Sequence, residues 1–317
     1  MDYYQPDITW SVFGIKNQEN FVKQFVIKAR FHKAVHKDVV SSYKTVEYLM
    51  AHSYYHYPMF DEAKRKLSSI FEMAVKLRSE ELGNSLSFKT KKGDIKEKTL
   101  GKLIDELKKN DYPESFIKKM HWARNVRNFD SHPNNFFFAG ALLKNYFFSL
   151  INDINELFLP VLVLVSEDKQ LEELKAKYAL SLKGLYKLKY EENYILAYDP
   201  VLLKTWQKDN QWISAICFLP VLNNTKDFIA SHNSLKPVLF FVTDLIFSDK
   251  GIEAIDSDTN KKLFFNKTDN LENINRFEKH LKEMNSSLVE DKQLFELSFD
   301  NDTAHLVEKA KYFSWSE

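Results

Sequence analysis

Apolar residues recur at spacings of three and four along most of residues 38–179, which is the period of amphipathic α-helices. The clearest stripe lies within residues 59–82 and consists of Ala63, Leu67, Ile70, Ala74 and Leu77. Gly83 follows this stripe and is a natural helix stop. The same pattern predicts further helices over residues 38–57, 99–109, 113–132, 138–159 and 166–179. The polar residues 84–96 are predicted as a loop.

Beyond residue 183 the pattern changes to short β-prone runs separated by turn-like residues. The runs are 194–199, 212–219, 237–247 and 261–266, and helices are expected over 270–285 and 303–312. The resulting fold class is mainly α, with a helical bundle followed by an α+β domain that contains a small antiparallel sheet. The predicted organisation is a lead-in segment at 1–37, a bundle at 38–179 and a regulatory or target-sensing domain at 180–317.

The amino-acid composition disfavours several classes of binding site and of protein. Seven glycines in 317 residues disfavour glycine-rich nucleotide loops, and a formal net charge of +1 gives no global basic field. The single cysteine, Cys217, excludes an intramolecular disulfide and a cysteine zinc cluster. The first residues do not read as a signal peptide, and the longest apolar runs are too short to span a bilayer. We therefore expect a cytoplasmic protein with no membrane partner and no cofactor.

The segment RNVRNFDSH, residues 124–132, carries the candidate chemistry. Advancing about 100° per residue, Arg127 falls on the apolar stripe of its predicted helix, where a guanidinium must be paired or open into a cleft. Asn128 and His132 are four residues apart and share one face. An arginine can hold a phosphate and a histidine can move a proton near neutral pH, so this group of residues suits phosphoryl transfer on RNA without a metal.

The run from Arg127 to His132 resembles the motif of HEPN domains, in which an arginine and a polar residue precede a histidine near the end of a late helix. The resemblance covers about residues 38–165 and rests on this one motif and the order of the helices. It implies a helical bundle that dimerises to form a composite cleft, and a metal-independent endoribonuclease of toxin or anti-phage defence systems. Arg127 would bind phosphate, His132 would act as general base or acid, and Asn128 would support them. A tyrosine that some members carry two residues after the histidine is replaced here by Asn134.

Two further residues, Arg124 and Ser131, are candidates for substrate contacts, and the expected partners are RNA, a second copy of the chain and an antitoxin or activating ligand. Three other interpretations stay open. Arg127 and His132 can form an ordinary helix end, since the helix dipole favours histidine at a C-terminus and arginine can pair with a nearby acid. A HEPN-type module can be an inactive scaffold that binds a nucleotide or a protein, and the bundle can be unrelated to HEPN domains. The histidine pairs 32/36 and 52/56 have metal-ligand spacing but lack a clear third ligand, so structural roles are expected for them.

Overall fold

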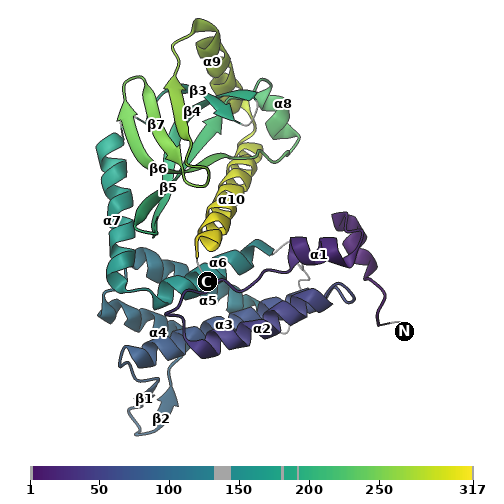
Figure 1. The fold of residues 1–317 in the computed structure, drawn as a ribbon, viewed down its shortest axis with the longest axis vertical. Helices are drawn as coiled ribbons and strands as arrows, with labels where there is room; N and C mark the ends of the chain where they lie inside the picture. Colours follow the sequence, from purple (N-terminus) through teal and green to yellow (C-terminus); the bar gives the residue numbers. More distant parts are fainter. Residues whose placement is uncertain (1–2, 132–143, 180–181, 191–192, 316–317) are drawn as a thin grey trace. The chain divides into compact units, whose positions relative to one another are not determined.

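The computed structural model describes residues 3–131, 144–179, 182–190 and 193–315, with the side chains of 129–131 and 190 left out of the description (Figure 1). The chain forms two compact units. The first comprises Met1–Val165 and Glu308–Glu317, and the second comprises Ser166–Val307. Helices α7 and α10 both cross the division between the units.

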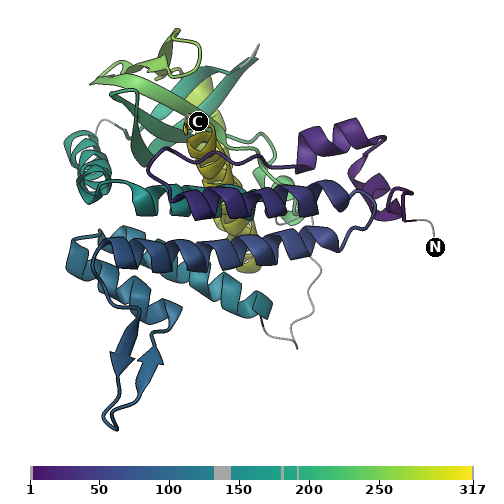
Figure 2. The ribbon, with the colours of Figure 1, turned by 60° about the horizontal axis from the view of Figure 1, so that its bottom comes forward.

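The first unit is helical. Its elements are η1 (Ile8–Phe13), α1 (Gln18–Phe25), α2 (Lys37–His52), α3 (Met59–Glu81), β1 (Ser87–Lys89), β2 (Ile95–Glu97), α4 (Leu100–Glu106), η2 (Leu107–Asn110), α5 (Glu114–Ser131), α6 (Lys144–Phe158), the start of α7 (Val161–Tyr178) and the end of α10 (Val289–Ser314). Figures 1 and 2 both show α2 and α3 lying side by side. The predicted helix at 59–82 is confirmed by α3, whose stripe residues Ala63, Leu67, Ile70 and Ala74 are almost completely buried.

The core of this unit is rich in aromatic rings. Trp10 is 1% exposed, packs edge-on against Phe21 at 4.5 Å between ring centroids, and donates its indole N–H to the Ser53 carbonyl at 2.7 Å. Helix α6 is buried from Tyr146 to Phe158 except at Ser149, and the buried part includes Asn152, Asp153, Asn155 and Glu156. Buried polar side chains need hydrogen-bond or ion-pair partners, and Lys119 and Lys311 supply partners for Asp153 and Glu156.

The predicted loop at 84–96 is wrong, because β1 and β2 form an antiparallel hairpin with Phe88 opposite Lys96. This hairpin extends from the helical layer in Figure 2. Strands of three residues have little hydrophobic alternation to read, so the pattern gave no signal for them.

The second unit is built around a closed barrel in which strands β3 to β8 pair in sequence order and β8 returns to β3. Its elements, besides the remainders of α7 and α10, are β3 (Leu185–Tyr190), β4 (Asn193–Lys208), β5 (Gln211–Pro220), α8 (Thr225–Ala230), β6 (Val238–Ser248), β7 (Gly251–Asp256), β8 (Lys262–Lys267) and α9 (Leu271–Ser286). Every neighbouring pair is antiparallel. Tyr186, Phe218 and Phe265 are completely or almost completely buried in its core.

The prediction of a small antiparallel sheet is therefore wrong, because six strands close into a barrel. Two of them, β3 and β7, interleave their apolar positions with lysines or acids and were not among the predicted runs. Closure of a barrel leaves no strand edge with unpaired backbone groups. The closing pair joins Tyr186 to Lys267, about 80 residues apart, and local patterning carries no signal for such a contact.

Candidate functional site

Arg127 lies near the end of α5, where the sequence pattern places it on the apolar side of the helix. Phe116, Met120 and Ala123 on that side are buried, and the Arg127 side chain is 34% exposed. The guanidinium is thus neither sealed in the core nor fully solvated. A cation in this position needs a partner, and the structure supplies one from another helix.

That partner is Glu72 of α3. Arg127 Nη2 donates to Glu72 Oε2 at 2.5 Å, and Arg127 Nη1 donates to the Asn128 side-chain oxygen at 3.2 Å. Lys76, one turn further along α3, lies 3.1 Å from the other Glu72 oxygen. The carboxylate thus bridges two cations and fixes the direction of the Arg127 guanidinium, because charge-assisted hydrogen bonds are directional and strong.

The structure describes the other predicted site residues in part. Asn128 is exposed beside Arg127. The Arg124 guanidinium packs against Gly101 of α4 and donates to Asn125 at 2.8 Å, so its neighbours differ from those of Arg127. His132 and the side chain of Ser131 lie outside the described residues.

An aromatic group on α5 and α6 is a feature that sequence reasoning missed. Trp122 is 54% exposed and its ring centroid lies 6.0 Å from that of Tyr146, which is 6% exposed. The ammonium of Lys64, from α3, lies 5.9 Å from the Tyr146 ring. Tryptophan side chains are usually largely buried, so an exposed one is notable. The sequence pattern around Trp122 gave no indication that this side chain would be exposed.

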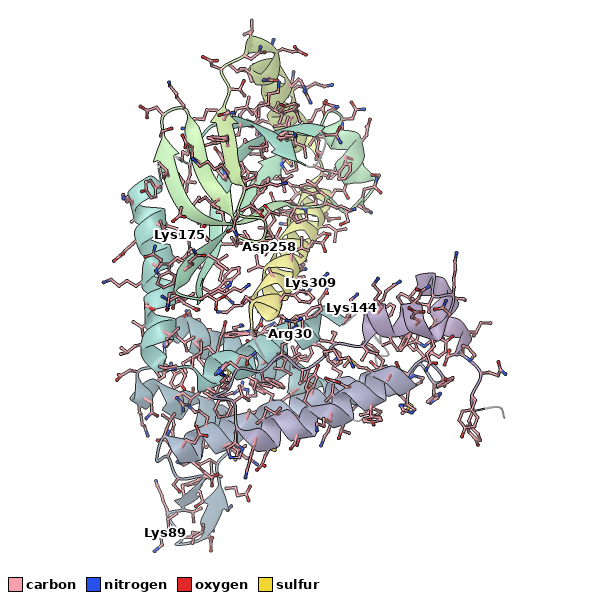
Figure 3. The ribbon with its side chains drawn as sticks, in the orientation of Figure 1. Arg30, Lys89, Lys144, Lys175, Asp258 and Lys309 are labelled. Carbon is pink, nitrogen blue, oxygen red and sulfur yellow. The ribbon has the colours of Figure 1, made fainter. Side chains whose placement is uncertain are left out.

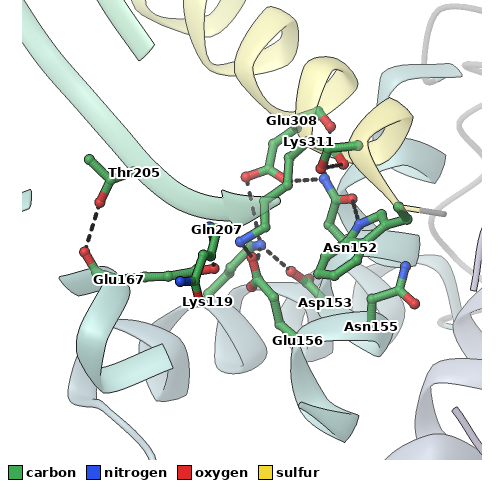
Figure 4. A network of polar contacts seen from close by, with 12 residues as sticks. Lys119, Asn152, Asp153, Asn155, Glu156, Glu167, Thr205, Gln207, Glu308 and Lys311 are labelled. Atoms are coloured by element: carbon green, nitrogen blue, oxygen red, sulfur yellow. Dashed lines mark hydrogen bonds and ion pairs between the residues drawn. The ribbon is translucent and has the colours of Figure 1, made fainter. Parts of the chain in front are cut away.

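A buried ionic network is the second feature that sequence reasoning missed (Figure 4). It joins α5, α6 and the end of α10 within the first unit. Lys119 lies 2.6 Å from Asp153 and 3.0 Å from Glu156, and Lys311 lies 2.8 Å from the other oxygen of Glu156. Glu308 completes the network at 3.6 Å from Lys119. The signal in the sequence was the run NDINE inside a strongly apolar helix, because polar residues on every face of a buried helix require partners.

Burial controls the electrostatics of this network. Desolvation is the largest effect on Asp153 and raises its pKa to about 7, with Lys119 opposing the rise and Glu156 and Glu308 adding to it. Burial alone would lower the pKa of Lys119, but the neighbouring carboxylates outweigh it and hold that pKa well above its usual value. Two ammonium groups therefore face three carboxyl groups, one of which titrates near neutral pH.

The histidines with metal-ligand spacing have local contacts. His32 Nε2 lies 2.8 Å from the Asn155 carbonyl, His36 caps the start of α2, and His52 Nδ1 lies 2.9 Å from the Tyr48 carbonyl. Among the described residues, no three His, Cys, Asp or Glu side chains gather in a geometry suited to a metal ion.

Within the described part of the chain, no individual helix has the length and apolar character to cross a bilayer, while the sharply bent pair α6 and α7 meets that test only when taken together. Comparison of the chain with protein-family descriptions, with curated proteins and with solved structures finds no match in any of the three.

Proposed function

We propose that this protein is a metal-independent endoribonuclease whose cleavage site includes Arg127, Asn128 and His132. One observation carries the proposal. The Arg127 guanidinium is held in a fixed direction by Glu72, yet about a third of its side chain remains open to solvent. A restrained and partly exposed arginine side chain is suited to hold a phosphate, and the sequence places a histidine five residues further on, as in HEPN domains.

The proposed reaction is attack of the ribose 2′-oxygen on the adjacent phosphorus. His132 accepts the proton of the 2′-hydroxyl as the new P–O bond forms. The bond to the 5′-oxygen breaks as that oxygen takes a proton from water, and His132 then releases its proton to solvent. The products are a 2′,3′-cyclic phosphate and a free 5′-hydroxyl. Arg127 offsets the negative charge that builds on the phosphate oxygens, and Asn128 positions Arg127 through the hydrogen bond described above.

Glu72 is a positioning residue in this scheme. Its carboxylate would repel a phosphate if it carried its charge alone, but Lys76 at 3.1 Å and Arg127 at 2.5 Å offset that charge. Its contribution is to reduce the rotamer freedom of a long side chain before the substrate arrives. A toxin or anti-phage setting, assembly of two copies around a composite cleft and control by an antitoxin or an activating ligand are parts of the same proposal.

The test is cleavage of total RNA by purified full-length protein in EDTA. Wild-type protein is compared with Arg127→Ala, His132→Ala and the control Arg65→Ala, which removes an arginine that pairs with Glu62 on the exposed side of α3. We expect cyclic phosphate ends from the wild type and the control, and a loss of at least about a hundredfold in the other two variants. Equal cleavage by all four proteins would contradict the proposal.

The second candidate function is an inactive HEPN-type scaffold that binds a nucleotide or a protein. The observation in its favour is that the Arg127–Glu72 pair also serves as an ordinary link between α5 and α3. The same assay separates the two functions, because a scaffold leaves RNA intact in the wild-type sample as well.

A further inference from the structure

A second group of cations lies where the end of α10 packs in the first unit. We call it the basic–aromatic patch, and it consists of Arg30, Lys144, Lys309 and Phe313, of which the three cations are labelled in Figure 3. Arg30 precedes α2, Lys144 is the first residue of α6, and the other two belong to α10. Lys309 is exposed, Arg30 and Lys144 are half-buried, and the Phe313 ring is 51% exposed.

Arg30 contacts the Phe313 ring directly, and the two lysines are related to that ring through helix spacing and through neighbouring aromatic side chains. The Arg30 guanidinium carbon lies 5.1 Å from the Phe313 ring centroid. Lys309 and Phe313 are four residues apart on one helix and therefore share a face. Lys144 lies 5.1 Å from the Phe25 ring centroid, and it is followed one turn later by Phe148, which packs against Phe313 at 6.4 Å.

The patch gathers like charges that no described carboxylate pairs with. Among the described residues, none of its three cations forms an ion pair with a carboxylate, whereas Lys311, on the other side of the same helix, is paired with Glu156. The pKa of Lys144 is lowered, first by burial and then by the charge of Lys309. Like charges held close together are unfavourable neighbours in the free protein, and a bound anion would relieve that repulsion.

The exposed ring distinguishes the patch from a general anion site. An aromatic face accepts any nucleobase by stacking, and arginine and lysine side chains beside it hold the backbone phosphates. A simple inorganic anion would use the cations but gain nothing from the ring.

We propose that the basic–aromatic patch binds one nucleotide unit of single-stranded RNA, with the phosphate on Arg30, Lys144 and Lys309 and the base on Phe313. The choice of RNA among single-stranded nucleic acids rests on the proposed function. The patch then holds substrate at a place separate from Arg127, and it contributes to affinity without taking part in bond cleavage.

The test is binding of a fluorescent 2′-O-methyl RNA 12-mer, measured by anisotropy between 50 and 200 mM salt. This oligonucleotide lacks the attacking hydroxyl, so binding is read without cleavage. The variants are Lys309→Glu and Phe313→Ala, and the matched control is Lys44→Glu, which changes an exposed lysine on α2. We expect each patch variant to weaken Kd at least about fivefold and the control to change it less than about twofold. Lys309→Glu should also reduce the slope of log affinity against log salt by about 0.7.

The outcomes separate the patch from the cleavage site. Wild-type affinity in both patch variants, or no binding by the wild type, overturns the patch. A loss with Lys309→Glu but none with Phe313→Ala overturns the nucleotide assignment in favour of a general polyanion surface. Loss of binding in both variants, together with RNA that stays intact in the cleavage assay, supports the patch and rejects the proposed ribonuclease. Because Lys309 is exposed, Lys309→Glu is not expected to disturb folding. Its effect on binding therefore remains interpretable even if Phe313→Ala lowers the thermal unfolding midpoint of the protein.

Discussion

Replacing Asp153 by asparagine is expected to remove the contribution of this carboxyl to the pH dependence of stability in the first unit. The Asp153 carboxyl is 1% exposed, lies 2.6 Å from Lys119, and has no described hydrogen-bond donor on its second oxygen. Burial raises its pKa from 3.8 to about 7. Asparagine has the same shape as the neutral acid but cannot titrate.

The sign and size of the Asp153 contribution to the free energy of unfolding follow from the linkage between proton binding and folding. Between about pH 4 and pH 7 the folded protein holds the Asp153 proton and the unfolded chain has released it, so the free energy of unfolding falls as the pH rises. The stabilising contribution is complete below the unfolded pKa and is lost as the pH passes the folded one. Each pKa unit corresponds to about 1.36 kcal/mol, and a rise of about three units gives a total of up to about 4 kcal/mol. Between pH 5 and pH 7 the expected loss is up to about 3 kcal/mol.

The assay is urea unfolding followed by tryptophan fluorescence at pH 5, 6, 7 and 8. Trp10 and Trp315 report on the first unit, and Trp315 donates to Asn152 beside the network at 2.8 Å. Wild type, Asp153→Asn and the control Asp94→Asn, an exposed carboxyl in the β1–β2 turn, are compared at each pH. The barrel is unchanged in all three proteins, so the difference between variants isolates the network.

The expected result is that Asp153→Asn gains on the wild type by up to about 3 kcal/mol between pH 5 and pH 8, while Asp94→Asn follows the wild type at every pH. A difference between Asp153→Asn and wild type that stays constant within about 0.5 kcal/mol over this range would refute the reasoning. It would mean that Asp153 stays ionised in the folded protein and that its pair with Lys119 outweighs desolvation.

Three further substitutions test other parts of the structure. Lys311→Ala should cost about 3–5 kcal/mol in urea unfolding, because it leaves Glu156 buried without one of its cations, and a cost below about 1 kcal/mol would argue against the pair. Gly251→Ala should lower the stability of the barrel by at least about 2 kcal/mol, since Gly251 has φ 146° and a β-carbon there would overlap the Phe265 carbonyl; a thermal midpoint equal to wild type would contradict this. Glu72→Gln should change the unfolding free energy by less than about 1 kcal/mol, because its pair with Arg127 is partly exposed, yet it should reduce kcat for RNA cleavage by about tenfold or more; unchanged kcat would remove Glu72 from the mechanism.

The long helix α3 was predictable because it carries its own periodicity, whereas the short helices α1 and α8 were not among the predicted elements. The stripe on α3 is readable from residues that lie within 23 positions of one another, and burial of that stripe follows directly. The barrel was not predictable in the same way. In β3, Leu185 and Leu188 are buried, but the lysines at 187 and 189 interrupt the apolar pattern of the segment. Closure then depends on pairing β3 with β8, and no local feature of either strand specifies that pairing.

The candidate site also had a predictable part and a part that the sequence pattern did not indicate. The position of Arg127 on an apolar stripe followed from helical geometry, and so did the need for a partner. The identity of that partner did not, because Glu72 lies 55 residues earlier and looks like any exposed acid on a charged helix. Ion pairs between distant residues depend on how the helices pack against each other. Sequence periodicity predicts which face of a helix is buried, but not which residue of a neighbouring helix contacts that face.

The end of α10 contributes side chains both to the buried network and to the basic–aromatic patch. Glu308, Lys311 and Tyr312 point inward, where the first two join the network and Tyr312 donates to the Lys28 carbonyl at 2.7 Å. Lys309 and Phe313 lie on the opposite side of the same two turns and remain exposed. Buried ion pairs add little net stability compared with apolar packing, but they can fix one register of a helix against its neighbours. We infer that the network sets the rotation of α10 and thereby holds Lys309 and Phe313 at the surface. Lys311→Ala should then weaken binding of the 2′-O-methyl RNA as well as stability, and binding that survives intact in this variant would show that the patch does not depend on the network.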